Sequence, residues 1–342
     1  MHKKITVFEH QSLRVGKQGF QQKHLNAVLK LNELHDWKYF NPIVNGIKFK
    51  EYVGIIQIDG LLIEIHPKSD KDDSDEKWQK VLLQMLQACG KLKATSAGTA
   101  NVKRSNLNLL EVYFELFLTE LQTLQRKGFS KQYRKQTQNT KALKGKLEFA
   151  GHIQRNSIHK ERFYTTHQVY DTDHLVHQII YKALTIVAQF TKGTWLYDFC
   201  KRMLINFPAV SNKSITTQQI NSVKLGRKFK DYENTFELAR LIILNYSPSI
   251  SGGKEKMLSL LFDMNALWET FIVKQLQKAS INTNIQVFKQ ETKPFWGNSY
   301  LQPDIILRKD NKVYIIDTKW KKPNNHKASI QDLRQMYTYC RF

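Results

Sequence analysis

Two aspartates and a lysine near the C-terminal end have the types and spacing that metal-assisted hydrolysis requires. Asp304 precedes one run rich in Ile and Leu, and Asp317 and Lys319 follow a second run rich in Val, Tyr and Ile. Between the two runs lie Asp310 and Asn311, which tolerate left-handed backbone and favour a tight turn. The pattern predicts a β-hairpin with acidic residues at its open end.

The register of this hairpin decides whether the acids meet. A two-residue turn places Lys309 opposite Lys312, and the same register then places Asp304 directly opposite Asp317 on one face. Lys319 lies on that face because strand side chains alternate. Opposed carboxylates repel unless a divalent cation lies between them, and their oxygen ligands suit Mg²⁺, with Mn²⁺ as a second possibility. The lysine would orient or deprotonate a water, or stabilise charge on a phosphate.

Further polar residues flank the hairpin in sequence. Glu269 lies on an amphipathic segment that we expect to belong to a helix over 257–276, where it could supply a third carboxylate or be an exposed helix charge. After the hairpin, Gln335 and Tyr339 are one helical turn apart and could position a phosphate or a water. Packing explains these two residues almost equally well. A surface hairpin with alternating charges is the alternative for the aspartates.

The charge of the chain indicates a polyanionic partner. The 342 residues include 53 Lys and Arg against 30 Asp and Glu, a net charge of +23, and 41% are hydrophobic, which is typical of a folded chain. The three widely spaced cysteines exclude a disulfide framework or a cysteine-based zinc site. No apolar run is long enough to span a membrane, so a cytoplasmic protein is predicted.

The basic residues concentrate in one segment. Residues 121–164 contain eleven Lys and Arg but only two acids, with aromatic residues between them. This imbalance favours a track for nucleic-acid phosphates over a merely solvated face. The residues predicted to contact DNA are Lys131, Arg134, Lys135, Lys141, Lys144 and Lys146, together with Tyr339.

Hydrophobic periodicity divides the chain into three segments. Residues 1–104 are mainly β-like and include two β-branched runs around Asp59-Gly60, a strong hairpin signal. Residues 105–235 are predicted to be mainly helical, because apolar residues recur at helical spacing over 105–127 and 173–190. Residues 236–342 carry the aspartates. The Walker pattern G-x-x-x-x-G-K-[ST] is absent, so we expect the chain itself to bind no nucleotide.

The residues around the hairpin also resemble known motifs. Pro303-Asp304, followed by Asp317-Thr318-Lys319, is similar to the PD-(D/E)xK nuclease signature, and Gln335-x-x-x-Tyr339 resembles a helix motif of RecB-type nucleases. In order along the chain, further segments resemble the McrC family, the endonuclease subunits of McrBC modification-dependent restriction systems. These segments are 53–58, 63–68, 143–149, 261–265, 301–307 and 316–321.

The McrC resemblance implies a fold and a division of labour. The fold would be α+β, with a β-rich N-terminal docking domain, a basic helical middle segment and a C-terminal PD-(D/E)xK (restriction-endonuclease-like) α/β core. The chain would cut DNA, whereas a separate McrB-like AAA+ GTPase would recognise methylated cytosine sites and be stimulated by this subunit. The sequence ends just after Tyr339, where relatives usually continue with a further strand.

The family motif also assigns roles. Asp304, Asp317 and Lys319 match it position by position, Glu269 and Gln335 match more loosely, and Mg²⁺ would be held by Asp304, Asp317, Glu269 and the Thr318 carbonyl. Two other functions stay open: a non-catalytic adaptor that regulates an AAA+ ring, and a stand-alone RecB-type repair nuclease.

Overall fold

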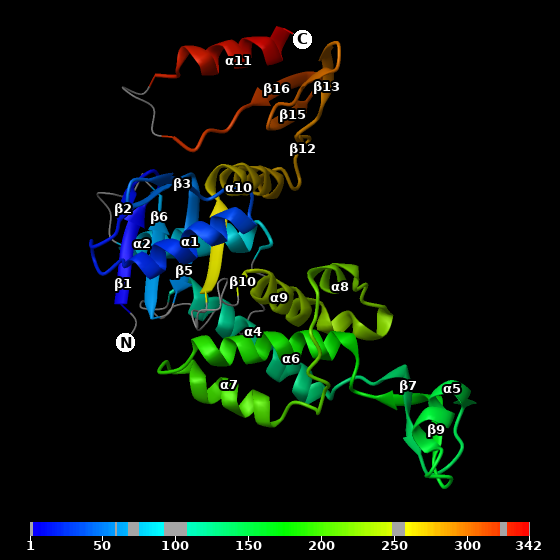
Figure 1. The fold of residues 1–342 in the computed structure, drawn as a ribbon. Coiled ribbons are helices and arrows are strands. Elements are labelled where there is room, and N and C mark those ends of the chain that lie inside the picture. Colours follow the sequence, from blue (N-terminus) through cyan, green and yellow to red (C-terminus); the bar gives the residue numbers. More distant parts are fainter. Residues whose placement is uncertain are drawn as a thin grey trace. The chain divides into compact units, whose positions relative to one another are not determined.

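The chain folds into two compact units, which Figure 1 colours along the sequence. The computed structural model describes residues 3–58, 60–67, 75–91 (backbone only for 75–80), 108–247, 257–321 and 327–341. Unit 1 combines the two ends of the chain, Met1–Leu110 and Ser247–Phe342, and unit 2 is Glu111–Tyr246. The units therefore differ from the predicted segments 1–104, 105–235 and 236–342, because the first and third share one unit.

A five-stranded sheet forms the centre of unit 1. Its order is β1-β6-β5-β11-β10, with β1 parallel to β6 and the β6-β5-β11 pairs antiparallel. The strands are β1 (Lys3–Phe8), β5 (Tyr52–Ile58), β6 (Leu61–His66), β10 (Tyr246–Ser247) and β11 (Met257–Asp263). Almost every residue of β5 and all of β6 are buried, which explains why both read as nearly continuous apolar runs.

The hairpin predicted around residue 60 is confirmed. Ile58 pairs with Leu61, so the turn has two residues, and Gly60 has a positive φ of 84°. Such a backbone conformation favours glycine, as two-residue hairpin turns require. Asp59 lies outside the described residues.

The helix predicted over 257–276 is wrong in its first part. Residues Met257–Asp263 form β11 against β5, and α10 (Met264–Ala279) begins only at Met264. The two strands approach closely at Gly54, where a Cβ atom would lie 2.0 Å from the Leu260 carbonyl oxygen. Asp263 ends the strand and caps the helix, since its Oδ1 accepts hydrogen bonds from Asn265 N and Ala266 N at 2.9 and 3.1 Å.

Smaller elements complete the N-terminal part of unit 1. A three-stranded sheet has the order β2-β4-β3, and Asn32 fastens the helix α1 to it by donating from Nδ2 to the Phe40 carbonyl oxygen at 2.7 Å. The bounds are β2 (Ser12–Arg14), α1 (Gln22–Leu34), β3 (Phe40–Ile43), β4 (Gly46–Phe49) and α2 (Asp75–Ala88). Phe20, Val28 and Phe40 are fully buried in the shared core.

Unit 2 consists mainly of helices, and α6 packs against both α7 and α9. The helices predicted over 105–127 and 173–190 are confirmed, beginning a few residues later than expected. The elements are α4 (Leu109–Lys127), α6 (Leu175–Phe190), α7 (Leu196–Ile205), α8 (Thr217–Ser222), η2 (Arg227–Tyr232) and α9 (Glu233–Leu244). Their periodic apolar faces are buried, with Tyr113, Phe117 and Ile179 fully enclosed.

The segment 105–235 is mainly helical, but its basic part contains a three-stranded sheet that the sequence pattern did not predict. Three antiparallel strands have the order β7-β9-β8. They are β7 (Gln132–Thr140), β8 (Lys146–Leu147) and β9 (Phe163–Asp171), and α5 (Phe149–Asn156) contacts β9. Strand β7 contains no Val, Ile or Leu, so its sequence lacks the apolar alternation by which strands are recognised.

The C-terminal part of unit 1 contains the predicted hairpin. Strands β12 (Gln286–Lys289), β15 (Ile305–Lys309) and β16 (Lys312–Ile316) form an antiparallel sheet in the order β12-β15-β16. A two-stranded ribbon, β13 (Lys293–Trp296) and β14 (Ser299–Leu301), lies between β12 and β15 in the sequence, and α11 (Ile330–Arg341) follows β16. The fold is therefore mixed α/β, and no described helix is long and apolar enough to cross a membrane.

Candidate active site

The hairpin register brings the two aspartates together, as predicted. Lys309 pairs with Lys312 across the turn, and the ladder continues to Ile305 and Ile316. Asp310 and Asn311 have positive φ angles of 46° and 59°, the left-handed conformation expected of a tight turn. Asp304 and Asp317 are the next residues beyond the last pair, at the open end of the hairpin.

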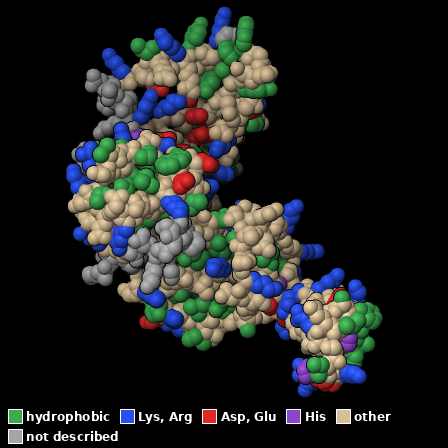
Figure 2. Space-filling view, in the orientation of Figure 1, with side chains coloured by type: hydrophobic (Ala, Val, Ile, Leu, Met, Phe, Trp, Pro, Cys, Tyr) green, Lys and Arg blue, Asp and Glu red, His purple; other side chains and the backbone are tan. Residues whose placement is uncertain are grey.

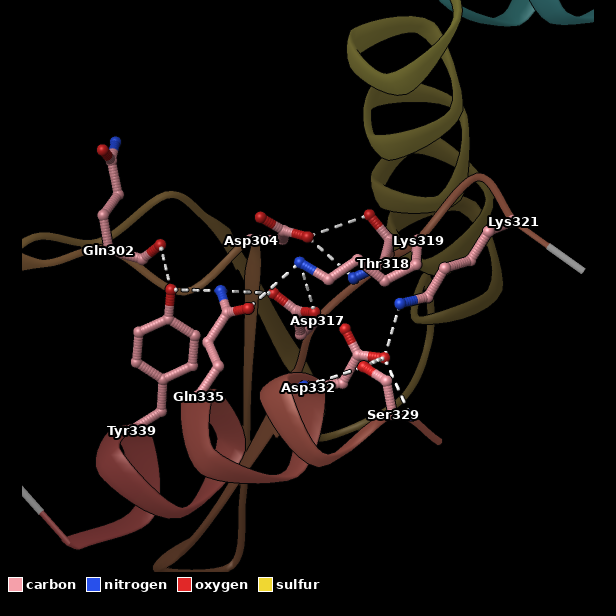
Figure 3. A network of polar contacts seen from close by, with 10 residues as sticks. All are labelled: Gln302, Asp304, Asp317, Thr318, Lys319, Lys321, Ser329, Asp332, Gln335 and Tyr339. Carbon is pink, nitrogen blue, oxygen red and sulfur yellow. Dashed lines mark hydrogen bonds and ion pairs between the residues drawn. The ribbon is translucent and has the colours of Figure 1, made fainter. Parts of the chain in front are cut away.

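Asp304 is oriented by hydrogen bonds from Thr318, the residue after Asp317. Its Oδ2 accepts hydrogen bonds from the Thr318 backbone N–H at 2.7 Å and from the Thr318 hydroxyl at 3.0 Å (Figure 3). Among the described residues no hydrogen bond reaches the other oxygen, Oδ1. Asp304 therefore has a fixed orientation and one oxygen available to a ligand.

Asp317 and Lys319 form an ion pair. Lys319 Nζ lies 2.9 Å from Asp317 Oδ2, and the Asp317 side chain is only 4% exposed. Partial burial lowers the pKa of Lys319, but the hydrogen bond and charge of Asp317 and the charges of Asp304 and Asp332 outweigh it, so the pKa lies above its usual value. The ammonium is thus protonated at neutral pH, which suits electrostatic stabilisation better than proton abstraction.

Helix α11 completes this network with Gln335 and Tyr339. The Gln335 amide donates to Asp317 Oδ1 at 3.1 Å and to the Tyr339 hydroxyl at 2.9 Å, and its Oε1 accepts from Lys319 Nζ at 3.1 Å. The Tyr339 hydroxyl donates to the Gln302 carbonyl oxygen at 3.2 Å. Both helix residues therefore lie at the aspartates, although the Tyr339 hydroxyl, predicted to contact DNA, is engaged within the chain.

Glu269 lies near Asp304 without joining a three-acid cluster. Its side chain is 15% exposed, accepts a hydrogen bond from Gln290 Nε2 at 2.8 Å and lies 3.7 Å from Lys289 Nζ. Burial raises the pKa of Glu269, Lys289 opposes this shift, and the charge of Asp304 adds to it. No group of three or more His, Cys, Asp or Glu side chains arranged to hold a metal occurs among the described residues.

The donor set nevertheless fits a hard cation that keeps several waters. Asp304 and Asp317 offer carboxylate oxygens at one end of the hairpin, and the Thr318 carbonyl belongs to the same turn of chain. Mg²⁺ is commonly bound by one or two carboxylates, with water and phosphate oxygens as its other ligands. Two aspartates are sufficient for such a site. Glu269 is close enough to Asp304 for the two charges to interact.

Sequence reasoning missed the residues that hold these acids in place. Gln290 has a positive φ of 51°; its backbone N–H donates to the Asp304 carbonyl oxygen at 3.1 Å while its side chain binds Glu269. Lys321 and Asp332 form a further ion pair beside Lys319. No motif or spacing marks these residues, because their contacts depend on how distant elements pack.

A cavity of about 770 Å³ lies beside Tyr339. Its apolar wall includes Pro303 and Ile306, and its cationic residues are Lys293, Arg308 and Arg341. Ile306 and Asp304 share one face of the hairpin because side chains alternate along a strand. The hairpin face that bears the aspartates therefore continues into a concave surface lined by both apolar and charged residues.

The predicted DNA-binding residues of unit 2 differ in their surroundings. Lys131, Lys135, Lys141, Lys144 and Lys146 are exposed on or beside the β7-β9-β8 sheet. In Figure 2, the part of the surface formed by these strands presents Lys and Arg side chains beside hydrophobic ones. This sheet is therefore a positively charged surface.

Arg134 is the exception among these basic residues. It forms a bidentate pair with Asp171, at 3.0 Å from Nε to Oδ1 and 2.8 Å from Nη2 to Oδ2, and Asp173 lies 3.5 Å away. The hydrogen bond to Asp171 raises the pKa of Arg134, and burial opposes this only in part. Its charge is paired within the chain, unlike that of the exposed lysines, and its role as a phosphate ligand stays a prediction.

The fold and the site together define a mixed α/β protein whose C-terminal hairpin carries paired carboxylates supported by a lysine and a helix glutamine. Comparison with known families identifies the particular group. The model of the family described as "McrBC 5-methylcytosine restriction system component" matches residues 47–342, and the chain belongs to this family.

Individual relatives agree with this assignment. The chain is 24% identical over 265 residues to the Escherichia coli (strain K12) "Type IV methyl-directed restriction enzyme EcoKMcrBC", covering 70% of this chain and 75% of that protein. Two solved structures from Thermococcus gammatolerans share the fold at 22% identity. One, a half-complex from a tetradecameric assembly of McrB AAA+ hexamers with bound McrC, gives a TM-score of 0.75 over 99% of this chain and 84% of that chain. The other, the McrBC complex, gives 0.59 over 80% and 87%.

Proposed function

We propose that this chain is the DNA-cleaving subunit of an McrBC-type modification-dependent restriction system, with a nuclease centre of the PD-(D/E)xK type. The observation that carries the proposal is the network in which Asp317 binds Lys319 and Gln335 while Asp304 lies beside it. The reaction is Mg²⁺-dependent hydrolysis of a DNA phosphodiester, with Mn²⁺ as the alternative ion.

Each residue has a defined part in this reaction. Asp304, Asp317 and the Thr318 carbonyl would hold the cation, which when bound lowers the pKa of a coordinated water and neutralises phosphate charge. Lys319, protonated beside Asp317, would stabilise negative charge developing on the phosphate. Gln335 orients Asp317 and Lys319 relative to each other. Glu269 would interact with water near Asp304.

The partner follows from the relatives. A Thermococcus gammatolerans assembly combines McrB AAA+ hexamers with bound McrC. We therefore infer that this chain acts in the cytoplasm with an McrB-like AAA+ GTPase, which it stimulates and which selects methylated double-stranded DNA. The absence of a Walker pattern agrees with GTP binding by the partner alone. The exposed lysines of the β7-β9-β8 sheet would bind the DNA backbone without regard to sequence.

A reconstituted cleavage assay tests the proposal. The chain and its McrB-like partner are incubated with methylated plasmid DNA, GTP and Mg²⁺, and Asp317→Asn is compared with wild type. We expect cleavage to fall by about 100-fold or more, because Lys319 and Gln335 lose their charged partner. Lys309→Ala, at the exposed turn of the same hairpin, is the matched control and should cut normally.

Three results would contradict the proposal. Normal cleavage by Asp317→Asn would place the nuclease centre elsewhere. Stimulated GTP hydrolysis without DNA breaks in the wild type would identify an adaptor. Cleavage from DNA ends without any GTPase would identify a stand-alone RecB-type nuclease.

A further inference from the structure

Helix α11 reaches the aspartates without a buried side chain. None of its residues, Ile330–Arg341, is buried, although Gln335 provides two of the contacts to Asp317 and Lys319. A helix of this kind gains little positional stability from apolar packing. Polar contacts must therefore determine where Gln335 lies.

One of these contacts is an ion pair one turn before Gln335. Lys321 Nζ lies 2.5 Å from Asp332 Oδ2. Ser329 supports the same oxygen through its hydroxyl at 2.6 Å and its backbone N–H at 3.1 Å, and the Asp332 N–H returns a hydrogen bond to Ser329 Oγ at 3.2 Å. This reciprocal arrangement resembles a capping box and orients the Asp332 carboxylate.

The ion pair joins the two segments that must be aligned. Lys321 is two residues beyond Lys319, on the strand extension that carries the aspartate-lysine pair, whereas Asp332 is three residues before Gln335 on the helix (Figure 3). We propose that Lys321 and Asp332 are positioning residues whose ion pair sets the distance between Gln335 and the Asp317-Lys319 pair. The inference rests on the proposed nuclease function of this site.

Loss of the Lys321-Asp332 ion pair should have different effects on folding stability and on the cleavage rate. An exposed ion pair contributes only about 0–1 kcal/mol to folding, so its loss should leave the chain folded. A displacement of about 1 Å at reacting groups can reduce a rate by as much as 100-fold. Removal of the pair should therefore affect turnover far more than unfolding.

Four variants of the full chain with its partner test the inference. Lys321→Met and Asp332→Asn each remove one charge, the double variant removes both, and Lys321→Arg keeps the charge. We expect kcat to fall about tenfold in each single variant with KM for DNA unchanged, since only alignment is altered. The double variant should be no slower than either single variant, because the two residues act as a pair. Lys321→Arg should restore most of the rate.

A second ion pair provides the matched control. Arg308, on β15, and Glu291, just after β12, lie 2.7 Å apart, and neither forms a hydrogen bond with Gln335. Glu291→Gln should leave kcat unchanged. The thermal unfolding midpoint and stimulation of GTP hydrolysis, measured on every variant, report folding and assembly independently of cleavage.

The outcomes separate the inference from the function on which it rests. Full activity of Lys321→Met, or a loss confined to Asp332→Asn, would overturn the positioning role and leave Asp332 as a helix cap only. Additive losses in the double variant would also contradict it. If Asp317→Asn, assayed in parallel, cuts normally, the proposed function fails; if it is inactive while Lys321→Met is normal, only the ion-pair inference fails.

Discussion

The C-terminal hairpin and the β7-β9-β8 sheet are both polar, strongly charged parts of the molecule, but their charges are organised differently. At the hairpin, Asp317 and Lys319, which follow β16, form an ion pair, and Gln335 of α11 forms hydrogen bonds with both. On the sheet of unit 2, Arg134 is paired internally and the lysines lie exposed on the surface. A surplus of exposed charges indicates a surface for binding a partner. A network of contacts between residues far apart in the sequence indicates a catalytic site.

The largest effect is expected from replacing Asp304, the second carboxylate of the hairpin site. Asp304→Asn should reduce DNA cleavage by about 100-fold or more, because an amide binds a divalent cation more weakly than a carboxylate. Cleavage rate against Mg²⁺ concentration measures this loss, and DNA retention on a filter measures binding, which should stay normal. Asp310→Asn, at the turn, is the control and should behave as wild type. A fully active Asp304→Asn would remove this residue from the metal site.

The second effect concerns acid stability of unit 2, where the sheet joins the helices. His177 is fully buried, donates a hydrogen bond from Nδ1 to the Thr172 carbonyl oxygen at 2.7 Å, and its Nε2 lies 3.1 Å from Tyr232 Oη. Burial and the charge of His174 lower the pKa of His177 to about 4. The unfolded chain binds a proton near pH 6.5, so stability present at neutral pH is lost as pH falls from about 6.5 towards 4.

Urea denaturation at pH 7.5, 5.5 and 4.5 measures this dependence. The loss attributable to His177 should approach about 3 kcal/mol at the lowest pH. His177→Gln keeps a hydrogen-bonding group but cannot be protonated, so its stability should depend less steeply on pH. An equally steep loss in His177→Gln would assign the acid sensitivity to other groups.

The third effect concerns the exposed lysines of the β7-β9-β8 sheet. Replacing Lys141, Lys144 and Lys146 by alanine should weaken DNA binding and reduce the log-log salt slope by about 2.7, from roughly 0.9 per phosphate contact. The turnover number at saturating DNA should be unchanged, because none of these residues belongs to the network of Asp304, Asp317 and Lys319. Salt-dependent binding measured by fluorescence anisotropy decides the matter; an unchanged slope would show that this surface does not contact phosphates.

The smallest effect is expected for Arg134, whose charge is paired with Asp171, unlike the charges of the exposed lysines. Arg134→Ala should lower the free energy of unfolding of unit 2 by about 1 kcal/mol, because Asp171 loses a bidentate partner. The salt slope of DNA binding should stay as in wild type, in contrast to the lysine variant. A slope reduced by about 1 would show that Arg134 contacts phosphate despite its ion pair.

The parts predictable from sequence are those set by local rules. Asp310-Asn311 favours a two-residue turn, and a two-residue turn determines the register that brings Asp304 beside Asp317. Helical spacing likewise predicts α4 and α6. The family motif adds Gln335, whose contacts the structure shows.

The rest depends on pairing between distant segments. The apolar run that begins at Met257 fits a helix or a buried strand equally well, and only its pairing with β5 makes it a strand. Strand β7 is polar on both faces and gives no periodic signal. Gln290 and the Lys321-Asp332 pair enter the site through tertiary contacts, which spacing along the chain does not encode.

The junction between β11 and α10 limits how the molecule can be divided. Asp263 is both the last residue of a strand within the N-terminal sheet and the cap of the helix that carries Glu269, so no linker separates them. A fragment beginning at α10 would lack both β11 and its pairing partner β5, and with Asp263 it would lose the N-terminal cap of α10. The acid-bearing end of this protein therefore continues directly from a strand of the sheet, and a cut before Met264 would separate α10 from the residue that caps it.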